Sequence, residues 1–254
     1  MTDRTQIWSS GGGVQSTAIA VLILTGKLPK PDLSCIVDTE RERSTTWEYF
    51  EQYTKPALAS VNVFVERVPK SRYATVDLYG GKNKDSLLLP VWTTQSGETG
   101  KLPNYCSNEW KSRVLHRWAK QEHQVRQATM WMGMSTDEAR RIKYPKGVWQ
   151  KSYPLFDLGI SRKDCVDIIT NYGWPVPKSS SCWMCPNHKQ GQWLEIKQDG
   201  KSGDFVKAIM FEKGIQKKNP HVFLTAAVVP LQEVTFSEED EVLFGSCDSG
   251  MCFV

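Results

Sequence analysis

The chain has 254 residues, of which 40% are hydrophobic and 24% are charged. This composition excludes a disordered or fibrous chain, and the length suits one large domain or a domain with a smaller appendage. The net charge of +4 permits contact with nucleic acid without arguing for it. No apolar run approaches the roughly 18 residues of a membrane helix, and no signal-peptide cleavage site follows the apolar stretch 18–24. We therefore expect a cytoplasmic protein without membrane contact.

Strand-like and helix-like patterns alternate in the first part of the chain. Strands are predicted at residues 6–10, 33–37, 62–68 and 128–134, and helices at 17–24, 46–59, 107–121 and 161–172. Ser107 is expected to cap the third of these helices, and Ser161 with Asp164 forms a capping-box start for the fourth. Periodicity is lost from residue 69 to 105, which is typical of a long active-site loop or an inserted hairpin. This order predicts an α/β fold with a parallel, doubly wound sheet.

A glycine-rich turn follows the first predicted strand and precedes the first helix. Gly11, Gly12 and Gly13 let the backbone turn tightly and approach a ligand closely. The helix N-terminus and its N–H groups then favour an anion, and the hydroxyls of Ser10, Ser16 and Thr17 add polar contacts. The spacing matches neither the Walker A nor the G-x-G-x-x-G pattern. A phosphate site is the favoured interpretation, and a tight turn without ligand is the alternative.

Charged residues follow several predicted strand ends. Lys111 and Arg113 come after Cys106, and Arg140 follows the fourth strand, so they are candidates for binding phosphate or sulfate; a solvated helix face is the alternative. The remaining candidates are acidic. Asp38 and Glu40 are candidates for ribose hydroxyls, and Asp137 or Glu138 is either a magnesium ligand through water or an acid at a helix N-terminus.

The chain contains seven cysteines, an odd number that gives no disulfide framework. Cys182 and Cys185 form a Cys-x-x-Cys motif, and Cys106 is a third candidate metal ligand. A 4Fe-4S cluster, a structural zinc, a redox dithiol and unliganded thiols all remain open. Cys247 and Cys252 lie in the tail as ligands, nucleophiles or idle thiols. The remaining two, Cys35 and Cys165, are expected to be buried structural residues.

The segment from Ser10 to Thr17 resembles the PP-loop of the N-type ATP pyrophosphatases and the phosphoadenosine-phosphosulfate (PAPS) reductases. Gln15 stands where that family usually has Asp, and Gly11 where it has the first Ser. Further segments resemble elements of PAPS-reductase-like proteins common in phages and bacteria: residues 36–40, 46–49, 133–140, 153–155, 161–165 and 182–186. The resemblance implies a fold like that of the adenine nucleotide alpha hydrolases.

The resemblance also implies a division of the chain and a function. Residues 1–150 would form the nucleotide-binding domain, and residues 151–254 an extension with the cluster site and the tail. The domain would bind ATP or PAPS through the PP-loop, including Gln15, and the enzyme would reduce PAPS or adenylyl sulfate through Cys252 and Cys247 with a thiol reductant. One alternative is an ATP-dependent sulfurtransferase that takes sulfur from a donor and modifies tRNA or DNA. Another is an accessory protein that binds nucleotide without turnover, which the departure at Gln15 favours. A homodimer is also expected.

Overall fold

The computed structural model describes residues 4–80 and 86–237. Within these limits the chain forms two compact units, and each is described by itself. Of the described residues, the first unit comprises 4–40, 45–73 and 114–180, and the second comprises 41–44, 74–80, 86–113 and 181–237. Both units are discontinuous in sequence, whereas the sequence predicts a linear division after residue 150. Among the described residues no helix is long and apolar enough to cross a membrane.

The first unit is built on a sheet of five parallel strands in the order β3-β2-β1-β6-β7. These are β1 (Thr5–Ser10), β2 (Leu33–Asp38), β3 (Val65–Pro69), β6 (Ala128–Trp131) and β7 (Trp149–Ser152). The strands β2 and β3 lie on one side of β1, and the later strands β6 and β7 lie on the other side. The order therefore reverses beside β1, which confirms the predicted α/β, doubly wound sheet.

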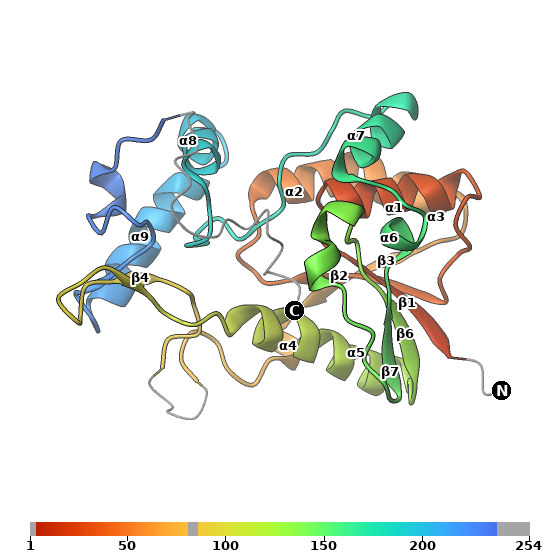
Figure 1. The fold of residues 1–254 in the computed structure, drawn as a ribbon, viewed down its shortest axis with the longest axis horizontal. Helices are drawn as coiled ribbons and strands as arrows, with labels where there is room; N and C mark the ends of the chain where they lie inside the picture. The colour runs from red at the N-terminus through yellow and green to blue at the C-terminus, as the bar shows by residue number, and fades with distance from the viewer. Residues whose placement is uncertain (1–3, 81–85, 238–254) are drawn as a thin grey trace. The chain divides into compact units, whose positions relative to one another are not determined.

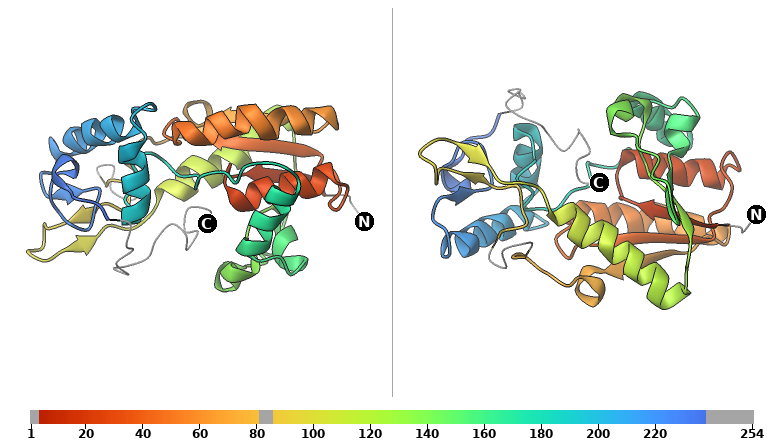
Figure 2. Two further views of the ribbon diagram at one scale, coloured as in Figure 1. Left: turned by 90° about the horizontal axis from the view of Figure 1, so that it is seen from above. Right: turned by 60° about the horizontal axis from the view of Figure 1, so that its bottom comes forward.

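Helices cover both faces of this sheet (Figure 1). One face carries α1 (Val14–Leu24), the continuous run of α2 (Ser44–Tyr49), η1 (Phe50–Thr54) and α3 (Lys55–Ser60), then α6 (Pro154–Asp157) and α7 (Arg162–Asn171). Two short elements, α4 (Lys70–Tyr73) and η3 (Thr136–Arg141), follow strand ends. On the opposite face lies α5 (Arg113–His123), where Trp118 Nε1 donates to Glu66 Oε2 at 3.0 Å. Figure 2 shows the sheet and the helices on its two faces from further directions.

The core of the first unit surrounds α1. Nine of the eleven residues of α1 are buried, because the helix is apolar on nearly all sides and is covered by the sheet and by α7. Trp8, Phe50 and Ile169 belong to the same cluster. Cys35 and Cys165 are fully buried, as predicted. Burial raises the pKa of Cys165 to about 12, so this thiol stays protonated at neutral pH.

The two predicted helix caps have different outcomes. The Ser161 hydroxyl accepts a hydrogen bond from Asp164 N at 3.1 Å, and Asp164 Oδ2 accepts one from Ser161 N at 2.8 Å, so the predicted capping box is confirmed. The prediction for Ser107 is wrong. Its φ of −61° and ψ of −43° are helical, because the helix has already begun before the π-helical turn η2 (Asn108–Ser112).

The second unit combines a small sheet with helices. The sheet is antiparallel and has the order β5-β4-β8, with β4 (Trp92–Thr93), β5 (Gly100–Lys101) and β8 (Val222–Phe223). Beside it lie α8 (Gln190–Gln198), α9 (Asp204–Gln216) and the short η4 (Leu231–Glu233). The pairing of β4 with β5 is the inserted hairpin that the loss of periodicity allows. Trp110, Met184 and Trp193 lie at the centre of the core.

Candidate functional site

The glycine-rich turn lies at the carboxyl end of β1, where the strand order reverses. Two backbone groups of the turn are held by its own side chains: Gly11 N donates to Ser16 Oγ at 2.8 Å, and Gly12 N donates to Ser10 Oγ at 3.2 Å. Gly12 has a φ of +71°, which favours glycine. Gly13 is the N-cap of α1 and has no side chain that could accept a hydrogen bond. The first N–H groups of this helix therefore receive no acceptor from the N-cap residue.

Neighbouring segments approach this turn closely. A Cβ at Gly12 would meet Thr46 Cγ2 at 2.6 Å, and a Cβ at Gly13 would meet Ser180 Oγ at 2.7 Å. Thr46 is buried, and among the described residues its Oγ1 has no hydrogen-bond partner. A buried hydroxyl without a partner costs free energy unless a ligand or water satisfies it. The turn therefore combines helical N–H groups with a buried hydroxyl, a combination that suits an anionic oxygen.

Gln15 lies in the first turn of α1 and connects an acidic side chain to a basic one. Its Nε2 donates to Glu138 Oε2 at 3.2 Å, and its Oε1 accepts from Arg162 Nη1 at 3.1 Å. Glu138 also bonds to Arg141. The neutral amide can satisfy both neighbours at once, which a carboxylate at this position cannot do. Gln15, the residue that departs from the PP-loop pattern, is thus part of a local hydrogen-bond network.

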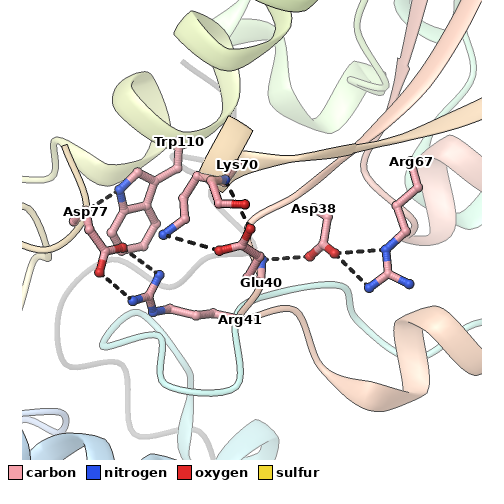
Figure 3. Close-up of polar contacts among 8 residues, drawn as sticks. Asp38, Glu40, Arg41, Arg67, Lys70, Asp77 and Trp110 are labelled. Carbon is pink, nitrogen blue, oxygen red and sulfur yellow. Dashed lines mark hydrogen bonds and ion pairs between the residues drawn. The ribbon is translucent and has the colours of Figure 1, made fainter. Parts of the chain in front are cut away.

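The two acids at the end of β2 and just after it contact cationic side chains of the first unit (Figure 3). Asp38 Oδ2 accepts from Arg67 Nε at 2.8 Å and forms an ion pair with Nη2 at 2.7 Å, and Arg67 also lies 3.8 Å from the centre of the Trp47 ring. Glu40 accepts from Ser71 N at 3.0 Å and lies 3.9 Å from Lys70 Nζ. Both carboxylates, predicted for ribose, are therefore engaged by the protein.

The other residues that the sequence predicts to bind an anion or magnesium lie in different surroundings. Asp137 Oδ2 accepts from Arg162 N at 2.5 Å and from Ser135 Oγ at 3.0 Å, and the bond from Arg162 N is the main reason that the pKa of Asp137 is lowered. Arg140 is exposed. Arg113 is exposed and pairs with Glu109 at 2.9 Å one helical turn away. The structure thus gives Asp137 a role in positioning the start of α7.

The second unit brings Lys111 and the predicted metal-ligating cysteines into one neighbourhood. Lys111 Nζ forms an ion pair with Glu42 at 3.1 Å. Burial lowers the pKa of Lys111, but Glu42 together with the thiols of Cys182 and Cys106 outweighs it, so the net pKa is raised and the ammonium stays charged. Figure 3 also shows the neighbouring Arg41 of this unit, which pairs with Asp77 at 3.0 Å.

The three cysteines are close enough to influence one another. Burial, followed by the charge of Cys185, raises the pKa of Cys106 to about 12, and Lys111 opposes both. Cys185 N donates to Cys182 O at 3.0 Å, which folds the Cys-x-x-Cys motif into a turn. Soft thiol donors beside a cation fit a metal or a cluster in chemical type. In the part of the chain that the structure describes, however, no three Cys, His, Asp or Glu side chains are arranged to hold a metal ion. Cys247 and Cys252 lie outside the described residues.

Several residues of these sites were missed by sequence reasoning. Thr46 and Arg162 contribute to the surroundings of the glycine turn, together with Glu138, which the sequence offered only as a magnesium candidate, and Glu42 holds Lys111. Glu42 lies within a run of alternating charges, which is typical of a solvated surface. Arg162 is the first residue of a helix, where charge is ordinary. A signal existed only for Glu138, which follows Ser135 at the capping-box spacing.

Comparison with known proteins gives limited information. No family model matches the chain, and no curated protein matches it. Among solved structures, the chain is similar to the phosphoadenylyl-sulfate (PAPS) reductase from Candida auris in a phosphate complex. The TM-score is 0.45 and the identity 16%, over 72% of this chain and 83% of that chain. A likeness at this level does not assign a function to the chain.

Proposed function

We propose that the chain binds an adenine nucleotide at the glycine turn and uses it in sulfur chemistry, as an enzyme that reduces PAPS or adenylyl sulfate. The observation that carries the binding step is the buried hydroxyl of Thr46, which has no partner among the described residues and belongs to a side chain whose methyl group lies against Gly12. The position of the turn supports it, because doubly wound sheets bind ligands where the strand order reverses. The choice of an adenine nucleotide as the ligand rests on the resemblance of residues 10–17 to a PP-loop.

In this proposal the turn binds phosphate with its backbone. The N–H groups at the start of α1 and the Thr46 hydroxyl donate to phosphate oxygens, while Ser10 and Ser16 keep the turn in shape by accepting from Gly12 and Gly11. Gln15 does not contact the phosphate in this scheme. It orients Arg162, whose guanidinium adds positive charge on the same side of α1.

The sulfur step is assigned to the tail. The Cys252 thiolate would attack the sulfur of the nucleotide-bound sulfate, so that an S–S bond forms and the S–O bond to the nucleotide phosphate breaks. The Cys247 thiolate would then attack Cys252, releasing sulfite and leaving a disulfide. The two cysteines thereby supply the two electrons, and an external thiol reductant restores them.

The cysteines of the second unit are the proposed ligands of a 4Fe-4S cluster, with zinc as the alternative. Cys106, Cys182 and Cys185 would hold it, and their gathering around Lys111 supports this. A bound cluster would supply one-electron redox chemistry in this unit, separate from the two electrons that Cys252 and Cys247 provide. An anaerobic visible spectrum, with iron, sulfide and zinc quantified, tests it: broad iron–sulfur absorbance supports a cluster, and a colourless, zinc-free protein excludes both.

Nucleotide binding is tested by calorimetric titration with ATP, PAPS and adenylyl sulfate. Thr46→Val removes the hydroxyl and keeps the shape, so we expect affinity to fall by about tenfold, the effect of losing one hydrogen bond to a charged group. Thr225→Val is the matched control. It removes a buried hydroxyl that also lacks a partner among the described residues, but from the second unit. Equal loss in both variants, or binding unchanged by Thr46→Val, would contradict the site.

The reaction is tested by sulfite release from PAPS and adenylyl sulfate under anaerobic conditions with a dithiol reductant. Deleting residues 247–254 should abolish release and leave nucleotide binding intact. Release that survives the deletion rules out the Cys252 mechanism. Nucleotide binding without turnover of any of the three nucleotides, a result that the network around Gln15 makes worth testing, would identify an accessory protein instead.

A further inference from the structure

The segment between η3 and α6 carries a concentration of positive charge. From residue 139 to 156 the sequence has five cationic residues and no acidic one, with Glu138 before and Asp157 after it. This segment contains β7, which is the last strand of the five-stranded sheet and pairs only with β6 within it. Cations along such an exposed edge protect it from pairing with another chain, so this protective role must be weighed against a binding role.

Aromatic rings lie among these cations. Trp149 and Lys151 point to the same face of β7, because successive side chains of a strand alternate. On that face the His116 ring lies 4.4 Å from the Trp149 ring, and Lys120 Nζ lies 6.0 Å from it. The indole Nε1 of Trp149 is buried and has no hydrogen-bond partner among the described residues. Edge protection alone does not require an aromatic ring bordered by cations.

The cations are close enough to repel one another. Burial lowers the pKa of Lys151, and the charges of Lys143 and Arg141 lower it further. Arg141 is compensated by Glu138. Lys143, Lys146, Lys151 and Lys120, by contrast, have no ion pair with any residue that the structure describes. Unpaired like charges cost stability, and a polyanion would relieve that cost.

A tyrosine extends this surface beyond the carboxyl end of β7. Tyr144 is 58% exposed and packs edge-on against Tyr153 at 5.3 Å between ring centres. The Tyr153 hydroxyl donates to Lys143 O at 2.7 Å and fixes the backbone next to Tyr144. The ring of Tyr144 is therefore largely exposed on a supported backbone, and its hydroxyl donates to Asp157 Oδ1 at 3.1 Å.

We propose that this surface, made of Lys120, Lys143, Tyr144, Lys146, Trp149 and Lys151 and here called the β7 edge surface, binds single-stranded nucleic acid. The lysines would contact phosphates and the exposed ring of Tyr144 would stack on a base. Charge complementarity and the alternation of cations with aromatic rings favour this ligand over an acidic protein segment, which offers no bases to stack. Four residues of strand span roughly 13 Å, enough to contact more than one phosphate. The inference stands independently of the proposed nucleotide site.

The test is fluorescence anisotropy with the full chain and a labelled oligonucleotide, as single-stranded DNA, as single-stranded RNA and as the DNA duplex, over a series of salt concentrations. Lys143→Ala/Lys151→Ala should weaken single-strand binding by about tenfold and reduce the slope of log K against log salt by about 1.4, or about 0.7 for each lost phosphate contact. Lys27→Ala/Lys30→Ala is the matched control, since both lysines are exposed in the first unit after α1. This control should keep wild-type affinity and slope.

A second variant separates nucleic acid from other polyanions. Tyr144→Ala should weaken oligonucleotide binding several-fold without changing the salt slope, and should leave binding of inorganic polyphosphate unchanged. Equal losses in the two double-lysine variants, tighter binding of the duplex, or no effect of Tyr144→Ala would each overturn the proposal. So would the absence of oligonucleotide binding. Thr46→Val should leave oligonucleotide binding intact, so failure here and failure of the nucleotide site are distinguishable.

Discussion

Gln15 Nε2 donates a hydrogen bond to Glu138 Oε2 at 3.2 Å, and this contact joins the first turn of α1 to the segment after β6. The same amide accepts from Arg162 at the start of α7. A residue that departs from a phosphate-loop pattern thus links three segments of the first unit. Since Gln15 follows Gly13 by two residues, the network positions the beginning of the helix whose N–H groups are proposed to bind phosphate.

Gln15→Asp should destabilise the protein, although it restores the more usual residue of the resembling family. The carboxylate cannot donate to Glu138 and places a second negative charge beside it, so we expect a loss of roughly 1–2 kcal/mol. Chemical denaturation measures it. In a Glu138→Gln background the same substitution should cost about 1 kcal/mol less, because the like charge is gone. An equal cost in both backgrounds would show that the two side chains do not interact.

Gly12→Ala should be more harmful than the same change at another glycine with the same backbone conformation. Gly12 and Gly26 both have a φ of +71°, but a Cβ at Gly12 would meet Thr46 Cγ2 at 2.6 Å whereas nothing lies within 4 Å at Gly26. Gly26→Ala should therefore cost only the left-handed strain, about 1 kcal/mol, and Gly12→Ala should cost that plus the displacement of Thr46. Thermal unfolding of the two variants compares them. Similar losses would mean that Thr46 moves away freely.

Breaking the pair of Lys111 and Glu42 should be costly. Glu42 is buried and the Lys111 side chain is only 18% exposed, so either Lys111→Met or Glu42→Gln removes an ion-pair contact from a largely buried charged group. We expect a loss of roughly 3 kcal/mol for each, and less than the sum for the double variant. Glu51→Gln, which removes the exposed partner of Lys55 in the first unit, should cost under about 0.5 kcal/mol. If the losses of the two single variants add up in the double variant, Lys111 and Glu42 are not energetically coupled.

Glu212 should make the second unit more stable in acid. Its buried carboxylate accepts from Leu224 N at 2.8 Å and from Leu231 N at 2.6 Å, but burial outweighs these bonds and raises its pKa. A raised pKa means that the folded state binds the proton more tightly. The contribution of Glu212 to the free energy of unfolding is therefore complete below the unfolded pKa of about 4.3. This contribution is lost as pH rises through the pKa of Glu212 in the folded state.

Substitutions of Glu212 separate its charge from its hydrogen bonds. Glu212→Gln removes the proton linkage, so denaturation between about pH 4 and 7 should show a flatter pH profile than the wild type. Glu212→Ala leaves two buried N–H groups unsatisfied and should cost roughly 2–4 kcal/mol at any pH. A Glu212→Gln profile parallel to that of the wild type would assign the pH dependence to other groups.

The sequence predicted the elements whose residues follow a clear period. The strands β1 and β2, the helix α7 with its Ser161 cap and the parallel, doubly wound character of the sheet belong to this group. The strand β7 was not predicted, because the sequence Trp-Gln-Lys-Ser has no apolar alternation and is recognisable only by its pairing with β6. The helices α8 and α9 were missed for a similar reason, since their apolar residues are not confined to one stripe.

The candidate site was only partly predictable. The glycine turn is visible because successive glycines between a strand and a helix indicate a tight backbone turn that a ligand can approach closely. Thr46 and Arg162 are distant in sequence from the turn, and although segments 46–49 and 161–165 resemble elements of a known family, nothing in those segments indicates that these two side chains lie near the turn. Asp38 was expected to face a ribose, but a carboxylate at a strand end is equally suited to an arginine, and Arg67 on the adjacent strand occupies it. Whether a carboxylate at a strand end faces a ligand or an arginine depends on contacts with the neighbouring strand, which the local sequence does not reveal.

The central claim, that the glycine turn binds the phosphate of an adenine nucleotide, is tested most directly by backbone amide NMR. Titrating the labelled protein with PAPS, ATP or adenylyl sulfate should cause saturable shifts in the amides of Gly12, Gly13 and Val14. Gly26, which shares the φ of Gly12 but lies at the other end of α1, should not shift. Saturable binding that leaves these three amides unmoved, or no binding of any of the nucleotides, would contradict the account.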